Sequence, residues 1–146
     1  MKLLRKGAIV DSPWLPLGYS DHGSSKRISA VPLQQLLQAL PAWEAKPSSW
    51  VALIEVDDNL ADLPPIALTR AAILVDFPTY TDGRGYSHAR TLRQQYAFRG
   101  ELVAVGDVRR DQLEFMRLVG FDSYQCAPDA DASVLQQALT ELRPDV

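Results

Sequence analysis

The chain is organised around residues 76–93 and the apolar run that leads into them; residues 71–93 read AAILVDFPTYTDGRGYSHARTLR. The apolar run over residues 71–75 is typical of a buried strand in a parallel sheet. The polar stretch that follows contains Gly83 and Gly85 and leads into a helix, for which Gly100 is a suitable stop. Ligands of α/β proteins bind just beyond the carboxyl ends of strands, so this strand-to-helix turn is the first candidate for a functional site.

Outward from this turn, apolar runs alternate with segments of helical periodicity. The alternation predicts a single α/β domain over residues 1–146, with successive βα units around a predominantly parallel sheet. A flavodoxin-like layer and a half-barrel both fit this pattern. The predicted strands are residues 50–56, 71–76, 102–105 and 121–126, and the predicted helices are residues 33–40, 83–98, 109–119 and 131–142.

The amino-terminal region is less regular. Residues 7–10 fit a short strand, and residues 11–27 contain the prolines, glycines and serines that are typical of a loop. Four apolar residues lie within this loop, and we expect them to anchor it to the core. A subunit contact is the alternative, because aromatic residues are enriched at interfaces. These four residues are Trp14, Leu15, Leu17 and Tyr19.

Composition narrows the class of protein. With 146 residues, 47% of them hydrophobic and 23% charged, the sequence is that of an ordinary globular domain. The net charge of −3 argues against general nucleic-acid binding, which usually needs a basic surface. No apolar run approaches the roughly 20 residues of a membrane span, and the first residues do not resemble a signal peptide. We therefore expect a cytoplasmic protein of bacterial type.

Metal and thiol chemistry are poorly supported. Cys126 is the only cysteine, so the chain cannot form an internal disulfide or a cysteine-ligated iron–sulfur cluster, and with His22 and His88 it makes a poor zinc site. Carboxylates that follow three strands could instead converge on Mg²⁺, although for at least one of Asp107 and Asp111 we favour helix capping. These carboxylates belong to Asp57, Asp58, Asp76, Asp82, Asp107 and Asp111. We predict no metal site.

The turn itself favours recognition of an anion or of a partner protein. Thr81 or Asp82 is suited to cap the helix, which leaves free N–H groups near Gly83 with Arg84 beside them. Such a helix start can hold a phosphate, a sulfate or a carboxylate. The candidate anion- or partner-binding residues are Asp82, Gly83, Arg84, Gly85, Tyr86, Ser87, Arg90, Asp107, Arg110 and Asp111. No catalytic residue is assigned, and no cofactor is specified.

An oxidoreductase that uses NAD(P) or a flavin at the same edge is the alternative. Asp107 follows the next strand, at the position expected of an acid that binds a ribose. His88 stands at the third glycine position of the dinucleotide fingerprint, and the preceding connection is too long for that fingerprint. Arg90 and Arg93 lie at or within the apolar stripe of the helix predicted over residues 83–98. An arginine in such a place needs an acidic or carbonyl partner. We expect one of them to form an ion pair with Asp76 or Asp107.

The helix over residues 112–119 carries apolar side chains over a wide arc. Such breadth indicates burial on more than one side, either within the domain or at a dimer contact. Residues 84–100 contain arginines but no acids, so they could form a basic face that docks an acidic partner. A solvated basic face is the alternative. Because the broad apolar helix could form a contact between copies, a non-catalytic, homo-oligomeric scaffold is a third possible function.

A long string of residues resembles a bacterial family known as domain of unknown function 934. The resemblance covers residues 50–126, whereas residues 1–45 match only loosely. It is carried by Phe77-Pro78, Asp82-Gly83-Arg84-Gly85-Tyr86-Ser87, Ala89-Arg90, Leu92-Arg93, Gly100-Glu101-Leu102, Ala104-Val105-Gly106-Asp107-Val108, Arg110-Asp111-Gln112 and Gly120-Phe121-Asp122.

This resemblance implies a role in sulfur metabolism. Members are commonly labelled as uncharacterised oxidoreductases involved in sulfite reduction, because they accompany sulfite reductase genes. The implied function is an accessory protein of assimilatory sulfite reduction, with subunits of sulfite reductase as partners. The family has no assigned catalytic residues to transfer. This chain has Leu118-Val119 where the family usually has Arg-Cys, which argues against a mechanism based on a thiol there.

Overall fold

The structure is a computed structural model that describes residues 1–16, 28–46, 49–79, 81–127 and 130–142. Leu17 and Tyr19, two of the predicted anchors of the amino-terminal loop, lie outside the described residues, as does His22. Within the described residues, no helix is long and apolar enough to cross a membrane.

The described strands form one eight-stranded sheet in the order β2-β1-β8-β7-β6-β5-β4-β3. Neighbours from β3 to β8 are parallel, and β1 is antiparallel to both β2 and β8. The prediction of a predominantly parallel sheet is therefore confirmed. The strands are β1 (Lys2–Arg5), β2 (Ala8–Asp11), β3 (Trp14–Pro16), β4 (Ile28–Pro32), β5 (Trp50–Ile54), β6 (Ala72–Phe77), β7 (Glu101–Gly106) and β8 (Ser123–Gln125).

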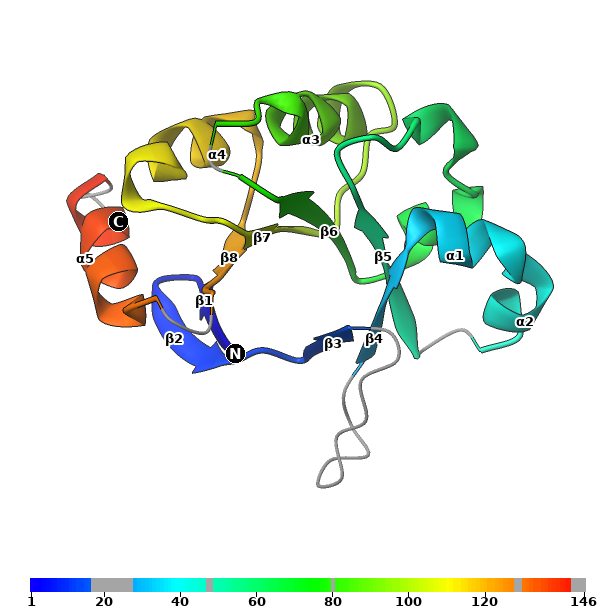
Figure 1. Ribbon diagram of the computed structural model, residues 1–146, viewed down its shortest axis with the longest axis horizontal. Helices are drawn as coiled ribbons and strands as arrows, with labels where there is room; N and C mark the ends of the chain where they lie inside the picture. Colours follow the sequence, from blue (N-terminus) through cyan, green and yellow to red (C-terminus); the bar gives the residue numbers. More distant parts are fainter. Residues whose placement is uncertain (17–27, 47–48, 80, 128–129, 143–146) are drawn as a thin grey trace.

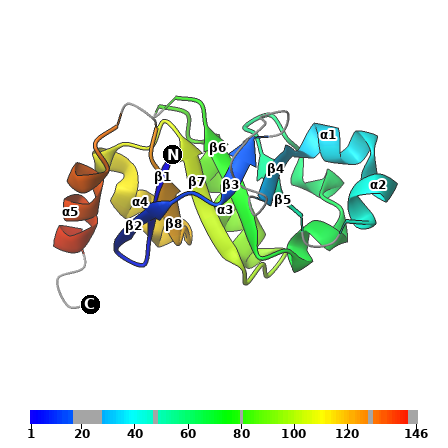
Figure 2. The ribbon, with the colours of Figure 1, turned by 90° about the horizontal axis from the view of Figure 1, so that it is seen from below.

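The helices lie on the outside of the curved arc of strands (Figure 1). Seen from below, α5 and the α1–α2 pair lie at opposite ends of the molecule (Figure 2). The α-helices are α1 (Leu33–Gln38), α2 (Leu40–Glu44), α3 (Arg84–Gln94), α4 (Leu113–Val119) and α5 (Ala132–Leu142), and the 3-10 helices are η1 (Leu60–Asp62), η2 (Pro65–Thr69) and η3 (Arg110–Gln112).

The helix predicted over residues 33–40 is two short helices. Ala39 separates α1 from α2 with φ −140°, which is not a helical angle. Pro41 then lies in the first turn of α2, where its missing N–H costs no intrahelical hydrogen bond. The apolar spacing of the sequence therefore continues from α1 into α2, although the helical conformation is interrupted between them. The interruption follows from Pro41.

The two faces of the sheet carry separate apolar clusters, because successive side chains of a strand point to opposite faces. From β6, Val75 and Phe77 belong to the larger cluster, which includes the buried residues of α1, α3, α4 and α5. Ala72 and Leu74 belong to a smaller cluster to which no described helix contributes. A flavodoxin-like layer has helices on both faces, so the half-barrel alternative fits this chain.

The smaller cluster also shows that the sheet curls. Leu3 on β1 and Trp14 on β3 come from strands near opposite ends of the sheet order, yet both belong to this cluster. Trp14 is 4% exposed, so its predicted role as a core anchor is confirmed. The loop predicted over residues 11–27 is wrong at residues 14–16, which pair with β4 from Trp14 opposite Ile28. Local sequence preferences carry no signal for that pairing.

Candidate functional site

The predicted turn holds a three-residue ion network at its centre. Arg84, the first residue of α3, donates from Nη2 to Oδ2 of Asp82 at 2.7 Å and from Nη1 to Oδ1 of Asp57 at 2.6 Å. Its Nε lies 3.0 Å from Oδ1 of Asp82. Asp57 follows β5 and Asp82 precedes α3, so parallel strands bring the two acids to one edge of the sheet.

Asp82 contacts the start of α3 but is not its N-cap residue, and neither is Thr81, so that part of the prediction is wrong. Its Oδ1 accepts the backbone N–H of Arg84 at 3.0 Å, although the residue at the N-cap position is Gly83. Hydrogen bonds from the Arg84 side chain and backbone lower the pKa of Asp82 from 3.8 to about 2. The same contacts raise the pKa of Arg84. A carboxylate of the chain therefore lies where an external anion would bind, and Arg84 is neutralised by two acids.

Of the two glycines of this stretch, packing requires only Gly85, the second residue of α3. A Cβ atom at this position would lie 2.5 Å from Cε2 of Phe77, a ring that is 1% exposed. Nothing lies within 4 Å of a Cβ atom built on Gly83. Gly85 therefore allows α3 to pack closely on β6, whereas Gly83 is not required by packing.

The remaining predicted residues are spread over three places. Ser87 and Arg90 are exposed on α3, and Tyr86 is half-buried there, with burial raising the pKa of its hydroxyl. Asp107 follows β7, and its Oδ1 accepts from Nε of Arg109 at 3.0 Å. Arg110 and Asp111 are exposed in η3, where Arg110 forms an ion pair with Glu141 of α5 at 3.5 Å.

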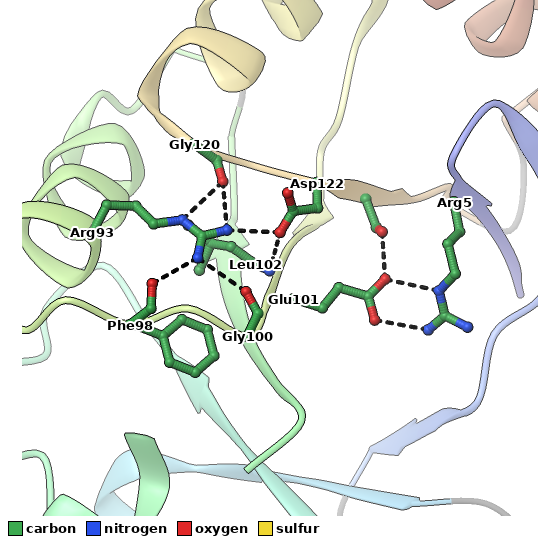
Figure 3. A network of polar contacts seen from close by, with 9 residues as sticks. Arg5, Arg93, Phe98, Gly100, Glu101, Leu102, Gly120 and Asp122 are labelled. Atoms are coloured by element: carbon green, nitrogen blue, oxygen red, sulfur yellow. Dashed lines mark hydrogen bonds and ion pairs between the residues drawn. The ribbon is translucent and has the colours of Figure 1, made fainter. Parts of the chain in front are cut away.

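The expected ion pair of Arg90 or Arg93 with Asp76 or Asp107 is wrong. Arg93 points to the opposite edge of the sheet, where Nη2 lies 2.6 Å from Oδ2 of Asp122 (Figure 3). Three backbone carbonyls also accept from its guanidinium, and they belong to Phe98, Gly100 and Gly120. This network satisfies the requirement that a half-buried arginine has partners, and it leaves Arg93 outside any site at the carboxyl edge.

A second polar network lies beside that of Arg93. Arg5 on β1 makes two hydrogen bonds to the carboxylate of Glu101 at 2.8 and 2.9 Å (Figure 3). Ser123 at the start of β8 donates to the same carboxylate. Glu101 and Ser123 begin their strands, so both networks lie at the amino edge, where conserved contacts of βα barrels serve stability rather than chemistry.

Two exposed apolar residues on α4 were not among the predicted site residues. Phe115 is 67% exposed and Leu118 is 65% exposed, and the rings of Phe115 and Tyr86 are 6.5 Å apart. The wide apolar arc of this helix is the sequence signal that indicates them. Burial within the domain accounts for Leu113 and Met116, and it leaves Phe115 and Leu118 uncovered.

A pocket of about 440 Å³ was also missed. It lies at the carboxyl end of the inner face and is lined by Leu53, Leu74, Asp76, Val105 and Gln125, among others. The signal for Asp76 was present in the sequence, because residues 72, 74 and 76 of one strand point to the same face. The sequence does not show which face is free of helices.

Acidic residues gather at this edge without forming a metal cage. Glu55 has a raised pKa because of burial and of the nearby charges of Asp58, Asp76 and Asp57. Oδ2 of Asp58 instead accepts the backbone N–H of Glu55 at 2.7 Å. In the part of the chain that the structure describes, no group of three acidic, histidine or cysteine side chains could hold a metal ion.

Comparison with curated proteins and with solved structures gave no match. Residues 51–144 match one family, which is described as a bacterial protein of unknown function, DUF934. The match begins in β5 and includes α3 with its turn, the pocket strands β6 and β7, and α4. The chain therefore belongs to the DUF934 family of bacterial proteins of unknown function.

Proposed function

We propose that this chain is a cytoplasmic accessory protein of assimilatory sulfite reduction that docks a subunit of sulfite reductase. The docking surface is the α3–α4 face, which we define by Tyr86, Arg90, Phe115 and Leu118. The observation that carries the proposal is the exposure of Phe115 and Leu118, at 67% and 65%. The gene-context label of the resembling family supports the choice of pathway.

Arg90 lies on the same side of α3 as Tyr86. It is four residues after Tyr86, whose ring is near Phe115, and three residues before Arg93, which donates to the carbonyl of Gly120 after α4. Residues spaced by three and four share one side of a helix, so Arg90 lies on the side of α3 that faces α4. Arg90 is exposed. An apolar centre with an arginine beside it has the composition of an interaction hot spot.

The charges favour a partner whose contact surface is apolar with acidic residues around it. Between Arg84 and Gly100 the chain contains no aspartate or glutamate. Arg84 and Arg93 are engaged in internal ion pairs, whereas Arg90 is exposed and shares one side of α3 with Tyr86, whose ring is 6.5 Å from that of Phe115. Complementary charge at such a surface sets the orientation and the association rate of a complex.

Recognition of a free anion at the turn has less support from the geometry. Asp82 accepts the N–H of Arg84, and Asp57 and Asp82 together neutralise the Arg84 side chain. An added sulfite or sulfate would have to displace these carboxylates. Titration of sulfite, sulfate and phosphate against the wild type and Arg84→Ala distinguishes anion recognition from docking of a partner. Docking of a partner predicts no anion binding that depends on Arg84.

The direct test is binding of the purified chain to purified sulfite reductase subunits. Replacing both Phe115 and Leu118 with serine removes the apolar centre, and we expect the affinity to fall by about 10- to 100-fold. Arg90→Glu reverses the exposed charge and should lower the affinity in a salt-dependent manner. Calorimetric titration gives the dissociation constant for each variant.

Val134→Ser is the matched control, because Val134 is an exposed apolar residue, at 45%, on α5. It should bind like the wild type. The proposal fails if the wild type does not bind the reductase or if the double variant binds equally well. If sedimentation shows a dimer that the double variant abolishes, with no binding to the reductase, the surface is instead a contact between two copies of this chain.

A further inference from the structure

The inner face of the half-barrel contains a cavity that the docking surface does not use. Its walls are predominantly apolar and include Trp14, Leu53, Leu74 and Val105. The volume of about 440 Å³ is within the range of small-molecule sites, roughly 300 to 1,000 Å³. It lies where βα barrels bind their ligands, at the carboxyl ends of β6 and β7.

Asp76 supplies a carboxylate to this apolar cavity. It is half-buried, and its carboxylate accepts the backbone N–H of Phe77. Within the described residues, no arginine, lysine or histidine forms an ion pair with it, whereas Asp57 and Asp82 share Arg84 at the same edge. A partly desolvated carboxylate without a cation is costly, and residues of this kind gather at functional sites.

The backbone is shaped to keep this carboxylate in place. Gly106 has φ +91°, and a Cβ atom there would lie 2.6 Å from Oδ1 of Asp76 and 2.5 Å from the carbonyl oxygen of Phe77. Only glycine combines that conformation with such a close approach. The Asp107 N–H then donates to the same carbonyl at 2.7 Å, which ties the ends of β6 and β7 together beside the cavity.

The other polar groups of the cavity define the chemistry of a ligand. Asp107 and Gln125 line it with Asp76, and no described arginine, lysine or histidine side chain does so. The indole nitrogen of Trp14, one of its walls, is buried and has no hydrogen-bond partner in the described part of the chain. Asp107 is paired with Arg109, so it is the Asp76 carboxylate that disfavours a small anion, sulfite included, and favours a largely apolar molecule that carries a hydrogen-bond donor.

We propose that this cavity binds a small, largely apolar molecule that carries an amine or another N–H group, which donates to the Asp76 carboxylate. Burial of the apolar body against Leu74, Val105 and Trp14 supplies the main attraction. The bond from the N–H group to the carboxylate sets the orientation and excludes acids of the same shape. This site is independent of the α3–α4 face.

Two probes of matched shape and opposite charge test the site: phenethylamine and 3-phenylpropionate. We expect the wild type to bind the amine with a dissociation constant at least tenfold lower than that of the acid. Asp76→Asn should reduce that preference to below about threefold. Asp62→Asn is the control, because it removes an exposed carboxylate outside the cavity and should leave the preference unchanged.

Chemical-shift perturbation of the wild-type amides locates the bound amine and does not depend on a variant. We expect the changes at residues 74–78 and 103–107, which line or flank the cavity. Equal binding of the two probes, a preference that persists in Asp76→Asn, or changes confined to other segments would overturn the proposal.

Discussion

At the scale of single residues, Arg93 contributes most clearly to stability. Its guanidinium donates to the carbonyls of Phe98, Gly100 and Gly120 and to Asp122, and it stacks 5.6 Å from the centre of the Phe98 ring. One side chain thereby connects α3, the start of β7 and the end of α4. The planar fork of an arginine suits this arrangement, whereas the single ammonium of a lysine does not.

We expect Arg93→Ala to lower the free energy of unfolding by about 2–4 kcal/mol, because it leaves several half-buried carbonyls without a donor. Arg93→Lys should lose more than half of that amount. The exposed Arg90→Ala is the control and should change stability by no more than about 0.5 kcal/mol. Urea denaturation measures all three, and equal stability of the Arg93 and Arg90 variants would contradict the assignment.

Whereas Arg93 stabilises the fold, the ionised carboxylate of Asp76 should lower the free energy of unfolding. Burial raises its pKa above the ordinary value of 3.8, so the folded chain retains this proton over a pH range in which the unfolded chain has lost it. The contribution to the free energy of unfolding is therefore largest at low pH and is lost as the pH rises through the folded-state pKa. At neutral pH, the ionised carboxylate destabilises the fold.

We predict that Asp76→Asn melts at a higher temperature than the wild type at pH 7. The difference should shrink as the pH falls and should vanish below about pH 3.8, where the wild-type carboxyl is protonated in both states. Thermal melts over this pH range check the sign. A variant that is less stable at pH 7 would show that the ionised carboxylate has a stabilising partner.

At the scale of the elements, the contact of α3 with β6 depends on one of two neighbouring glycines. A Cβ atom on Gly85 would overlap the buried Phe77 ring, and one on Gly83 would meet nothing. We expect Gly85→Ala to destabilise the fold by about 1–3 kcal/mol, since α3 has to move. Gly83→Ala, with φ −80°, should be neutral or slightly stabilising. Chemical denaturation distinguishes the two, and equal effects would refute this packing.

The elements that the sequence predicts well are those with strong local patterns. β6 and β7 are continuous apolar runs, and α3 and α5 have clear helical periods. β1, β3 and β4 were not predicted, because they are short and depend on partners distant in sequence. Leu3, for example, pairs with Gln125, at the other end of the chain.

At the scale of the whole molecule, the two edges of the half-barrel have different roles. The networks of Arg93 and Arg5 stabilise the amino edge, where β7 and β8 begin. The carboxyl edge carries the ion network of Arg84, the acidic residues and the cavity with Asp76. The location of a polar turn at this edge follows from the sequence and is correct.

The division of that edge into separate sites does not follow from the sequence. One partner of Arg84 is Asp57, which follows β5 and is 27 residues away, and only the fold brings them together. Because Arg84 is neutralised, the exposed residues that remain for a partner are Arg90 and Phe115 on the α3–α4 face. Tertiary contacts thus decide which of the arginines remain available to a partner.

Hydrogen–deuterium exchange can show whether the α3–α4 face docks a sulfite reductase subunit, as we propose. Exchange of the chain should be compared with and without saturating reductase. We predict slower exchange in residues 86–94 and 113–119 in the complex, and no such protection in the variant with serine at positions 115 and 118. Unchanged exchange in these two segments, or protection confined to α1 and α2, would show that the reductase does not dock on this face.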